Sequence, residues 1–150
     1  MSGGLLSVKI RFMRLSDVPA IVKIQEAVTR RKVSKEFGKK VRSFVKKGGG
    51  LSLVAEVGGE NAGYIIGDIK TWGFGVEESG WIEMVGVHPG SMGHGVGKKL
   101  GGELLKNFRA KGISSVHTTA RWDWGDMLAF FKSLGFEQSE FINLERNLRR

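Results

Sequence analysis

The stretch formed by residues 81–105 limits the fold more than any other part of the sequence. It opens with an apolar run, 81–87, that is rich in strand-forming residues and too short for a free-standing helix. Residues 88–90, His-Pro-Gly, end the run, and a glycine-rich segment, 93–97, follows. Apolar residues then recur every four positions, as on one face of a helix, at Val96, Leu100, Leu104 and Phe108. The stretch therefore predicts a strand, a glycine loop and a helix, in that order.

A glycine loop that enters a helix is suited to binding a pyrophosphate. Its backbone N–H groups point outward at the positive end of the helix dipole, and glycine lets a phosphate approach closely. A Walker loop is excluded because Lys99, rather than Ser or Thr, follows Gly97-Lys98. A Rossmann fingerprint is excluded because the glycines are one residue apart, twice, and lie far from the N-terminus. A glycine-rich surface turn is the remaining alternative to a phosphate site.

The pattern that remains is Val-x-Pro, a short spacer and Gly-x-Gly-x-Gly before an amphipathic helix. It resembles the acetyl-CoA loop of the GNAT family of N-acetyltransferases. The residues that carry the match are Val87, Pro89, Gly93, Gly95 and Gly97. The resemblance implies that acetyl-CoA is the cosubstrate and that its pyrophosphate is bound by Met92, Gly93, His94, Gly95, Val96, Gly97 and Lys98. The family usually has Arg or Gln where this chain has Met92, so part of the phosphate binding must come from elsewhere.

The remaining patterns predict an α/β domain. We expect strands over 8–12, 51–57, 62–69, 81–87, 113–119 and 137–146, helices over about 17–30, 34–47, 96–110 and 124–133, a hairpin turn at 58–61 and a loop at 71–80. This order is similar to the GNAT fold, which implies a mixed, mostly antiparallel sheet flanked by helices, with a V-shaped splay between its fourth and fifth strands. Residues 127–136 are similar to the family's aromatic pair and Leu-Gly-Phe ending, and place Phe131 at the cofactor.

Composition excludes several classes of protein. At 150 residues the chain is expected to be a single domain, 1–150. It has no cysteine, so disulfides, thiolate metal sites and a cysteine nucleophile are excluded, and we expect no metal. No apolar run is long enough to span a membrane and the first residues do not form a signal peptide, so we expect a cytoplasmic protein without a membrane partner.

The positive charge is concentrated in the first third of the chain. The net charge is +9, and 13 of the 24 Lys and Arg residues lie in 1–50. Nine of these lie in 30–47, where only Glu36 opposes them. Such a segment is typical of a solvated helix face, but it also suits an acidic partner or the steering of an anionic substrate. It does not favour nucleic-acid binding, because Phe37 and Phe44 are the only aromatic residues in it.

Acetyl transfer from a thioester to an amine requires a polarised carbonyl and a base. The resemblance assigns the first task to backbone N–H groups of Val85, Gly86 and Val87, where the strands splay. For the base we predict Glu83, an acid that alternation places on the strand face of Val85 and Val87. The alternative is that Glu83 lies at a sheet surface, paired with a lysine. His88 and His117 are further candidates.

A general acid is not evident. The family commonly has a tyrosine where this chain has Phe131, and an asparagine where it has Trp124. The only tyrosine is Tyr64, on the third predicted strand. Trp122 and Trp124 suggest an acceptor pocket in which Asp123 and Asp126 hold a cationic amine, although core packing is the simpler interpretation of the tryptophans.

Two functional hypotheses follow. The first is an acetyl-CoA-dependent N-acetyltransferase in which a primary amine attacks the thioester directly. The second, favoured by Met92, Trp124 and Phe131, is a GNAT-fold acyl-CoA-binding or regulatory protein with little turnover. The acceptor is a small molecule or a protein amine; Thr119 stands where the family's ribosomal-protein enzymes carry a glutamate, which disfavours that substrate. A monomer and a homodimer are both compatible with the sequence.

Overall fold

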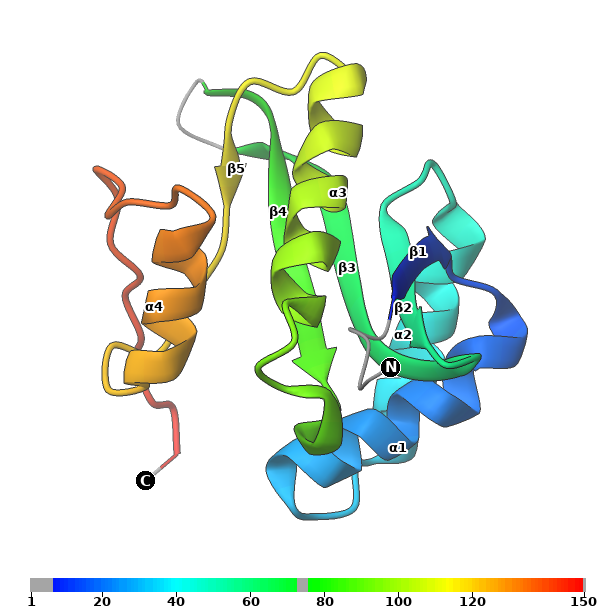
Figure 1. Ribbon diagram of the computed structural model, residues 1–150. Helices are drawn as coiled ribbons and strands as arrows, with labels where there is room; N and C mark the ends of the chain where they lie inside the picture. The colour runs from blue at the N-terminus through cyan, green and yellow to red at the C-terminus, as the bar shows by residue number, and fades with distance from the viewer. Residues whose placement is uncertain (1–6, 73–75, 150) are drawn as a thin grey trace.

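The computed structural model describes residues 7–72 and 76–149 and shows a mixed sheet between two helical layers (Figure 1). The sheet has the order β1-β2-β3-β4-β5 and is antiparallel except for the parallel pair β4–β5. The elements of the fold, in chain order, are β1 (Val8–Phe12), η1 (Leu15–Asp17), α1 (Val18–Thr29), α2 (Lys35–Lys47), β2 (Ser52–Val57), β3 (Glu60–Trp72), β4 (Val76–Val87), η2 (Pro89–Ser91), α3 (Val96–Ala110), β5 (Val116–His117) and α4 (Gly125–Ser133). The predicted fold class is confirmed.

Two apolar clusters hold the layers to the sheet. One lies beneath α3 and α4 and includes Leu100, Leu104 and Phe108, which are completely buried, as their spacing predicted. The other lies beneath α1 and α2 and includes Ile21, Val41 and Tyr64. Burying side chains of this size supplies most of the stabilisation, at roughly 1.5–3 kcal/mol each.

Helix α3 packs closely on the sheet because glycines lie under it. A Cβ atom at Gly67 would lie 2.7 Å from the Phe108 ring, and one at Gly80 would lie 2.9 Å from it. Helix α4 in turn packs on α3 at Gly101, where a Cβ would lie 2.5 Å from the Leu134 side chain. These missing side chains fix α3 beside β4, which is the position that the site requires.

The predicted loop over 71–80 is wrong for its described part. Strand β3 continues to Trp72, and β4 begins at Val76 rather than at residue 81. The register keeps Lys70 opposite Ser79 and Trp72 opposite Val76. Polar residues are compatible with a strand here because alternate side chains leave the core face. Residues 73–75 of the expected loop lie outside the described residues.

The C-terminal third has fewer strand residues than the sequence predicts. Strand β5 contains only Val116–His117 of the expected 113–119. The strand expected over 137–146 is absent from the described residues up to 149. Figure 1 shows the terminal segment, in red, running alongside α4 rather than beside β5. Without a neighbouring strand its alternating apolar residues stay exposed, by 75% at Ile142 and 82% at Leu144.

The basic segment 30–47 includes α2, whose apolar face is buried through Val41 and Phe44. Its basic residues are exposed on the opposite face. Two of them have acidic neighbours: Lys47 contacts Asp68 at 3.1 Å and Lys39 contacts Glu36 at 3.6 Å. An acidic partner for this segment stays a prediction. Among the described residues, no helix has the length and apolar character needed to cross a membrane.

Candidate active site

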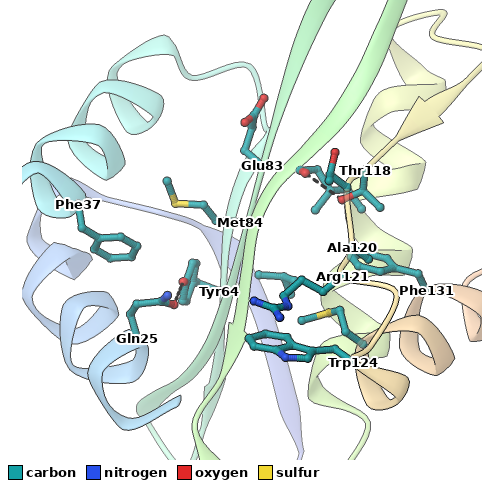
Figure 2. A pocket seen from close by; sticks show the side chains of 14 residues that line it. Gln25, Phe37, Tyr64, Glu83, Met84, Thr118, Ala120, Arg121, Trp124 and Phe131 are labelled. Carbon is teal, nitrogen blue, oxygen red and sulfur yellow. Dashed lines mark hydrogen bonds between the residues drawn. The ribbon is translucent and has the colours of Figure 1, made fainter. Parts of the chain in front are cut away.

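Strands β4 and β5 separate after two residue pairs. Gly80 lies opposite Val116 and Trp81 opposite His117, and the chain then turns away from β4. The hydroxyl of Thr118 donates a hydrogen bond of 3.1 Å to the carbonyl of Ile82 just beyond the last pair. A cavity of about 270 Å³ opens beside β4 at this point (Figure 2). The strand separation therefore creates a space at the centre of the fold.

The cavity reaches both helical layers. Ile82, Val85 and Phe131 line it from the α3–α4 cluster. Phe37 and Tyr64 line it from the α1–α2 cluster. A molecule in the cavity would therefore touch both sides of the sheet.

Glu83 lines this cavity, as a catalytic base would have to. Its carboxylate also forms an ion pair with Lys70 of β3, the alternative that the sequence left open. The expected alternation with Val85 is interrupted, because the β3–β4 register shifts between Ile66 and Gly67. Val85 packs in the α3 cluster, whereas Met84, next to Glu83, packs with the α1–α2 cluster. A bulge therefore turns Glu83 away from the face that was predicted for it.

The open edge of β4 offers backbone donors to the cavity side. The His88 amide donates to Ala62 of β3 at 2.8 Å. Because amides alternate between the two edges of a strand, those of Val85 and Val87 point to the edge that β5 has left. The amide of Gly86 then points toward β3, and a Cβ on this residue would lie 2.7 Å from the Tyr64 ring. Gly86 therefore makes room for Tyr64.

The glycine loop leads into α3 as predicted. Gly93 and Gly95 have φ angles of 85° and 77°, which other residues rarely adopt. Gly95 is the N-cap residue of α3 and provides no side-chain cap, so the first amides of the helix remain available to a ligand. Met92, His94 and Lys98 are exposed around this loop. Val96 is buried and anchors the first turn to the core.

Tyr64 and Gln25 form a polar pair in the cavity wall. The Tyr64 hydroxyl donates a hydrogen bond of 2.6 Å to Oε1 of Gln25 (Figure 2). The tyrosine side chain is only 1% exposed, and burial raises the pKa of its hydroxyl above the usual value of 10. The hydroxyl therefore stays protonated and holds the glutamine amide in one orientation.

The opposite wall carries Arg121 and Trp124. Arg121 donates from Nε and Nη2 to the two oxygens of Asp123, at 3.0 and 2.9 Å. Hydrogen bonds and charge from Arg121 lower the pKa of Asp123. The guanidinium also lies 5.5 Å from the centre of the Trp124 ring. Asp123 is thus engaged by an arginine, and neither it nor Asp126 lines the cavity in which we expected them to bind an amine.

The other predicted residues occupy different places. Phe131 lines the cavity but is buried against Phe136, and its ring brings no hydroxyl to the family's tyrosine position. His88 accepts a hydrogen bond from the Gly90 amide, and His117 stacks on Trp81. Neither histidine lines the cavity. Trp122 is 87% exposed and does not line it either.

Sequence reasoning missed Gln25, Arg121 and Thr118 as cavity residues. Gln25 lies in the apolar pattern of α1, and a polar residue there was the available signal. Arg121 adjoins the Trp122–Trp124 segment that the sequence singled out, but nothing local indicates which way its side chain points. The described residues contain no group of three His, Asp or Glu side chains that could hold a metal ion.

The opened sheet and the glycine loop together are the arrangement expected of a GNAT-type N-acetyltransferase. Residues 18–136 match the model of the acetyltransferase (GNAT) family, and the chain belongs to that family. A protein of Pectobacterium atrosepticum that is named as an acetyltransferase is 26% identical over 140 residues, which cover 93% of this chain and 95% of the relative.

Solved structures share the fold at low sequence identity. An aminoglycoside N-acetyltransferase in complex with CoA superposes with a TM-score of 0.82 at 16% identity, covering 99% of this chain and 100% of the other. A ribosomal-protein-alanine N-acetyltransferase from Brucella melitensis gives a TM-score of 0.75 at 15% identity, covering 95% and 100%. Membership of this family supports acyl transfer in general and leaves the acceptor of this chain to be argued from its own site.

Proposed function

We propose that this protein transfers an acetyl group from acetyl-CoA to a primary amine by direct attack. The observation that carries the proposal is the cavity between β4 and the chain after β5, which has Glu83 in its wall and unpaired strand amides at its edge. Membership of the acetyltransferase family supports the same reaction. The cytoplasmic location and the oligomeric state stay predictions.

The residues present fit the cosubstrate. Acetyl-CoA supplies an activated acetyl group, and its diphosphate is the part that the glycine loop would bind. The positive φ angles of Gly93 and Gly95 and the uncapped start of α3 suit the diphosphate, with Lys98 adding positive charge. The amides of Val85 and Val87 suit the thioester arm at the open edge of β4.

Glu83 is proposed as the base. The reaction forms an N–C bond to the amine, breaks the C–S bond of the thioester and releases one proton from the nitrogen. The carboxylate of Glu83, held by Lys70, accepts that proton directly or through water. Backbone amides at the β4 edge stabilise the negative charge that develops on the carbonyl oxygen. Phe131 cannot protonate the leaving sulfur, so the thiolate leaves as such and takes a proton from water.

The test is thiol release by the full-length protein with acetyl-CoA and a panel of amines. We expect Glu83→Gln to lower kcat/KM by roughly 10²- to 10⁴-fold while calorimetry shows unchanged binding of coenzyme A. Glu36→Gln is the matched control, because Glu36 is exposed on α2 and does not line the cavity. Wild-type rates in Glu83→Gln would remove this residue from the mechanism.

Phe131 favours a second candidate, an acyl-CoA-binding regulatory protein with little turnover, because it leaves the family's acid position without a hydroxyl. The same assay separates the two. Thermal stabilisation by both acetyl-CoA and coenzyme A, without thiol release across the panel, would favour the regulatory protein.

A further inference from the structure

The charges in the cavity wall differ from those that a cationic acceptor requires. Among the described residues that line the cavity, Glu83 and Arg121 are the charged ones. The carboxylate of Glu83 is already paired with Lys70. A polycationic amine would therefore meet one arginine and no unpaired carboxylate. The wall instead suits a ligand that brings its own negative charge.

Arg121 is held in place to present donors. Asp123 binds the edge of the guanidinium formed by Nε and Nη2, and Trp124 supports its face. This leaves Nη1 for a ligand. Figure 2 shows the guanidinium extending over Trp124 toward Gln25 and Tyr64. The Arg121–Asp123 pair is exposed to water, with side chains 65% and 43% accessible, so Asp123 neutralises the arginine only weakly.

Gln25 presents a second donor from the facing wall. Its Oε1 atom accepts the Tyr64 hydroxyl, so the free end of the amide is the NH₂ group. Arg121 and Gln25, which line the same cavity, thus each present a hydrogen-bond donor. An oxygen anion satisfies both, whereas an ammonium group satisfies neither.

We propose that the acceptor is a small amine that also carries an anionic oxygen group, a carboxylate or a phosphate, which Arg121 and Gln25 bind. The inference rests on the proposed acetyl transfer and names its substrate class. Figure 2 places Glu83 at the opposite end of the cavity from Arg121 and Trp124, so the amine of such a molecule lies toward the base while its anion lies at the donors. A volume of about 270 Å³ suits a small molecule or the end of a chain.

The experiment compares pairs of amines with and without an anionic group, together with a polycationic amine. Thiol release is measured with the full-length protein for an α-amino acid, the amide of the same amino acid, a phosphorylated amino alcohol, the free amino alcohol and an aminoglycoside. We expect kcat/KM for at least one anionic amine to exceed that of its uncharged partner at least ten-fold. Comparing the α-amino acid with the phosphorylated amino alcohol shows whether the site prefers a carboxylate or a phosphate. An uncharged amine or the aminoglycoside used equally well would overturn the proposal.

Variants identify the residues responsible. Arg121→Gln should raise KM for the anionic amine at least ten-fold, leave kcat nearly unchanged and bring the ratio between charged and uncharged acceptors close to one. Gln25→Leu, which keeps the size of the side chain, should lower that ratio in the same direction. Arg109→Gln is the control and should leave the ratio as in wild type, because Arg109 is exposed on α3 and does not line the cavity. An unchanged ratio in Arg121→Gln would overturn the assignment.

A binding measurement keeps this inference separate from the proposed reaction. If no amine releases thiol, the reaction proposal fails, and calorimetry of the same amines with the CoA-saturated protein then decides on the acceptor. Tighter binding of the anionic member of a pair, by at least ten-fold and lost in Arg121→Gln, would support the donor site on its own. Equal binding of both members would overturn it.

Discussion

The hydroxyl group of Tyr64 lies where the core of the protein meets the cavity. The ring occupies the space that Gly86 leaves, and the hydroxyl fixes the orientation of Gln25. The packing of this one buried ring thus determines how the Gln25 amide is presented in the cavity wall. A buried hydroxyl that loses its partner costs about 1–3 kcal/mol, so both members of the pair are expected to be sensitive to substitution.

Titration of Tyr64 gives a direct test of this arrangement. Burial raises the folded-state pKa above 10, so ionisation of the unfolded chain above that pH lowers stability as pH rises. Because Tyr64 is the only tyrosine, phenolate absorbance reports on it alone. We expect no phenolate in the folded protein near pH 10 and its appearance together with unfolding at higher pH. Phenolate at pH 10 with intact circular dichroism would show that the hydroxyl is accessible to water.

At the scale of elements, the position of α4 depends on its contact with α3. Leu134 occupies the space over Gly101, and the segment before α4 carries the cavity residues Arg121 and Trp124. The parallel β4–β5 pairing that precedes this segment is only two residues long. The helix contact is therefore a major constraint on the width of the cavity.

Alanine substitutions at two neighbouring glycines of α3 distinguish the effect of this contact on stability from the effect of helix propensity. Gly102→Ala adds a methyl group that meets nothing within 4 Å and should stabilise the protein by about 0.5–1 kcal/mol. Gly101→Ala gains the same propensity but collides with Leu134, which should cost about 1–3 kcal/mol. Urea unfolding of both variants measures the difference. Equal stability of the two would show that α4 is not held at Gly101.

For the molecule as a whole, the sequence predicts what depends on local patterns. The burial of Leu100 and Phe108 and the turn at Gly93–Gly95 follow from spacing and backbone conformation. The early end of β5 and the lack of a strand over 137–146 do not follow from local patterns, because a strand needs a partner edge that the local sequence does not specify. The bulge beside Glu83 depends on the register of β3, and the direction of Arg121 depends on where α4 packs.

Acid stability is a property of the whole molecule that one buried network influences. Asp17 is 5% exposed, and burial alone would raise the pKa of its carboxyl group. Its carboxylate accepts hydrogen bonds from Arg11, the Arg14 amide and Asn61. These hydrogen bonds outweigh burial and hold the pKa of Asp17 at about 2, against 3.8 for the free side chain. A lowered folded-state pKa stabilises the fold above pH 3.8, and the stabilisation, about 2 kcal/mol, is lost as pH falls toward 2.

Asp17→Asn removes this carboxylate. We expect the variant to be less stable than wild type at pH 7 by about 2 kcal/mol and to lose less stability between pH 4 and pH 2, as measured by urea unfolding across that range. Glu36→Gln, at an exposed ion pair with Lys39, should change stability by less than about 1 kcal/mol. Parallel pH profiles for wild type and Asp17→Asn would contradict the role of the network.

The cavity beside β4 is lined from both faces of the sheet, and this has a kinetic consequence. In the proposed reaction, the thioester at the open edge of β4 and the amine occupy this cavity at the same time. Neither reactant has to depart before the other arrives, and the protein itself need not become acetylated. Initial-rate plots for such an arrangement intersect, as they do for a ternary complex.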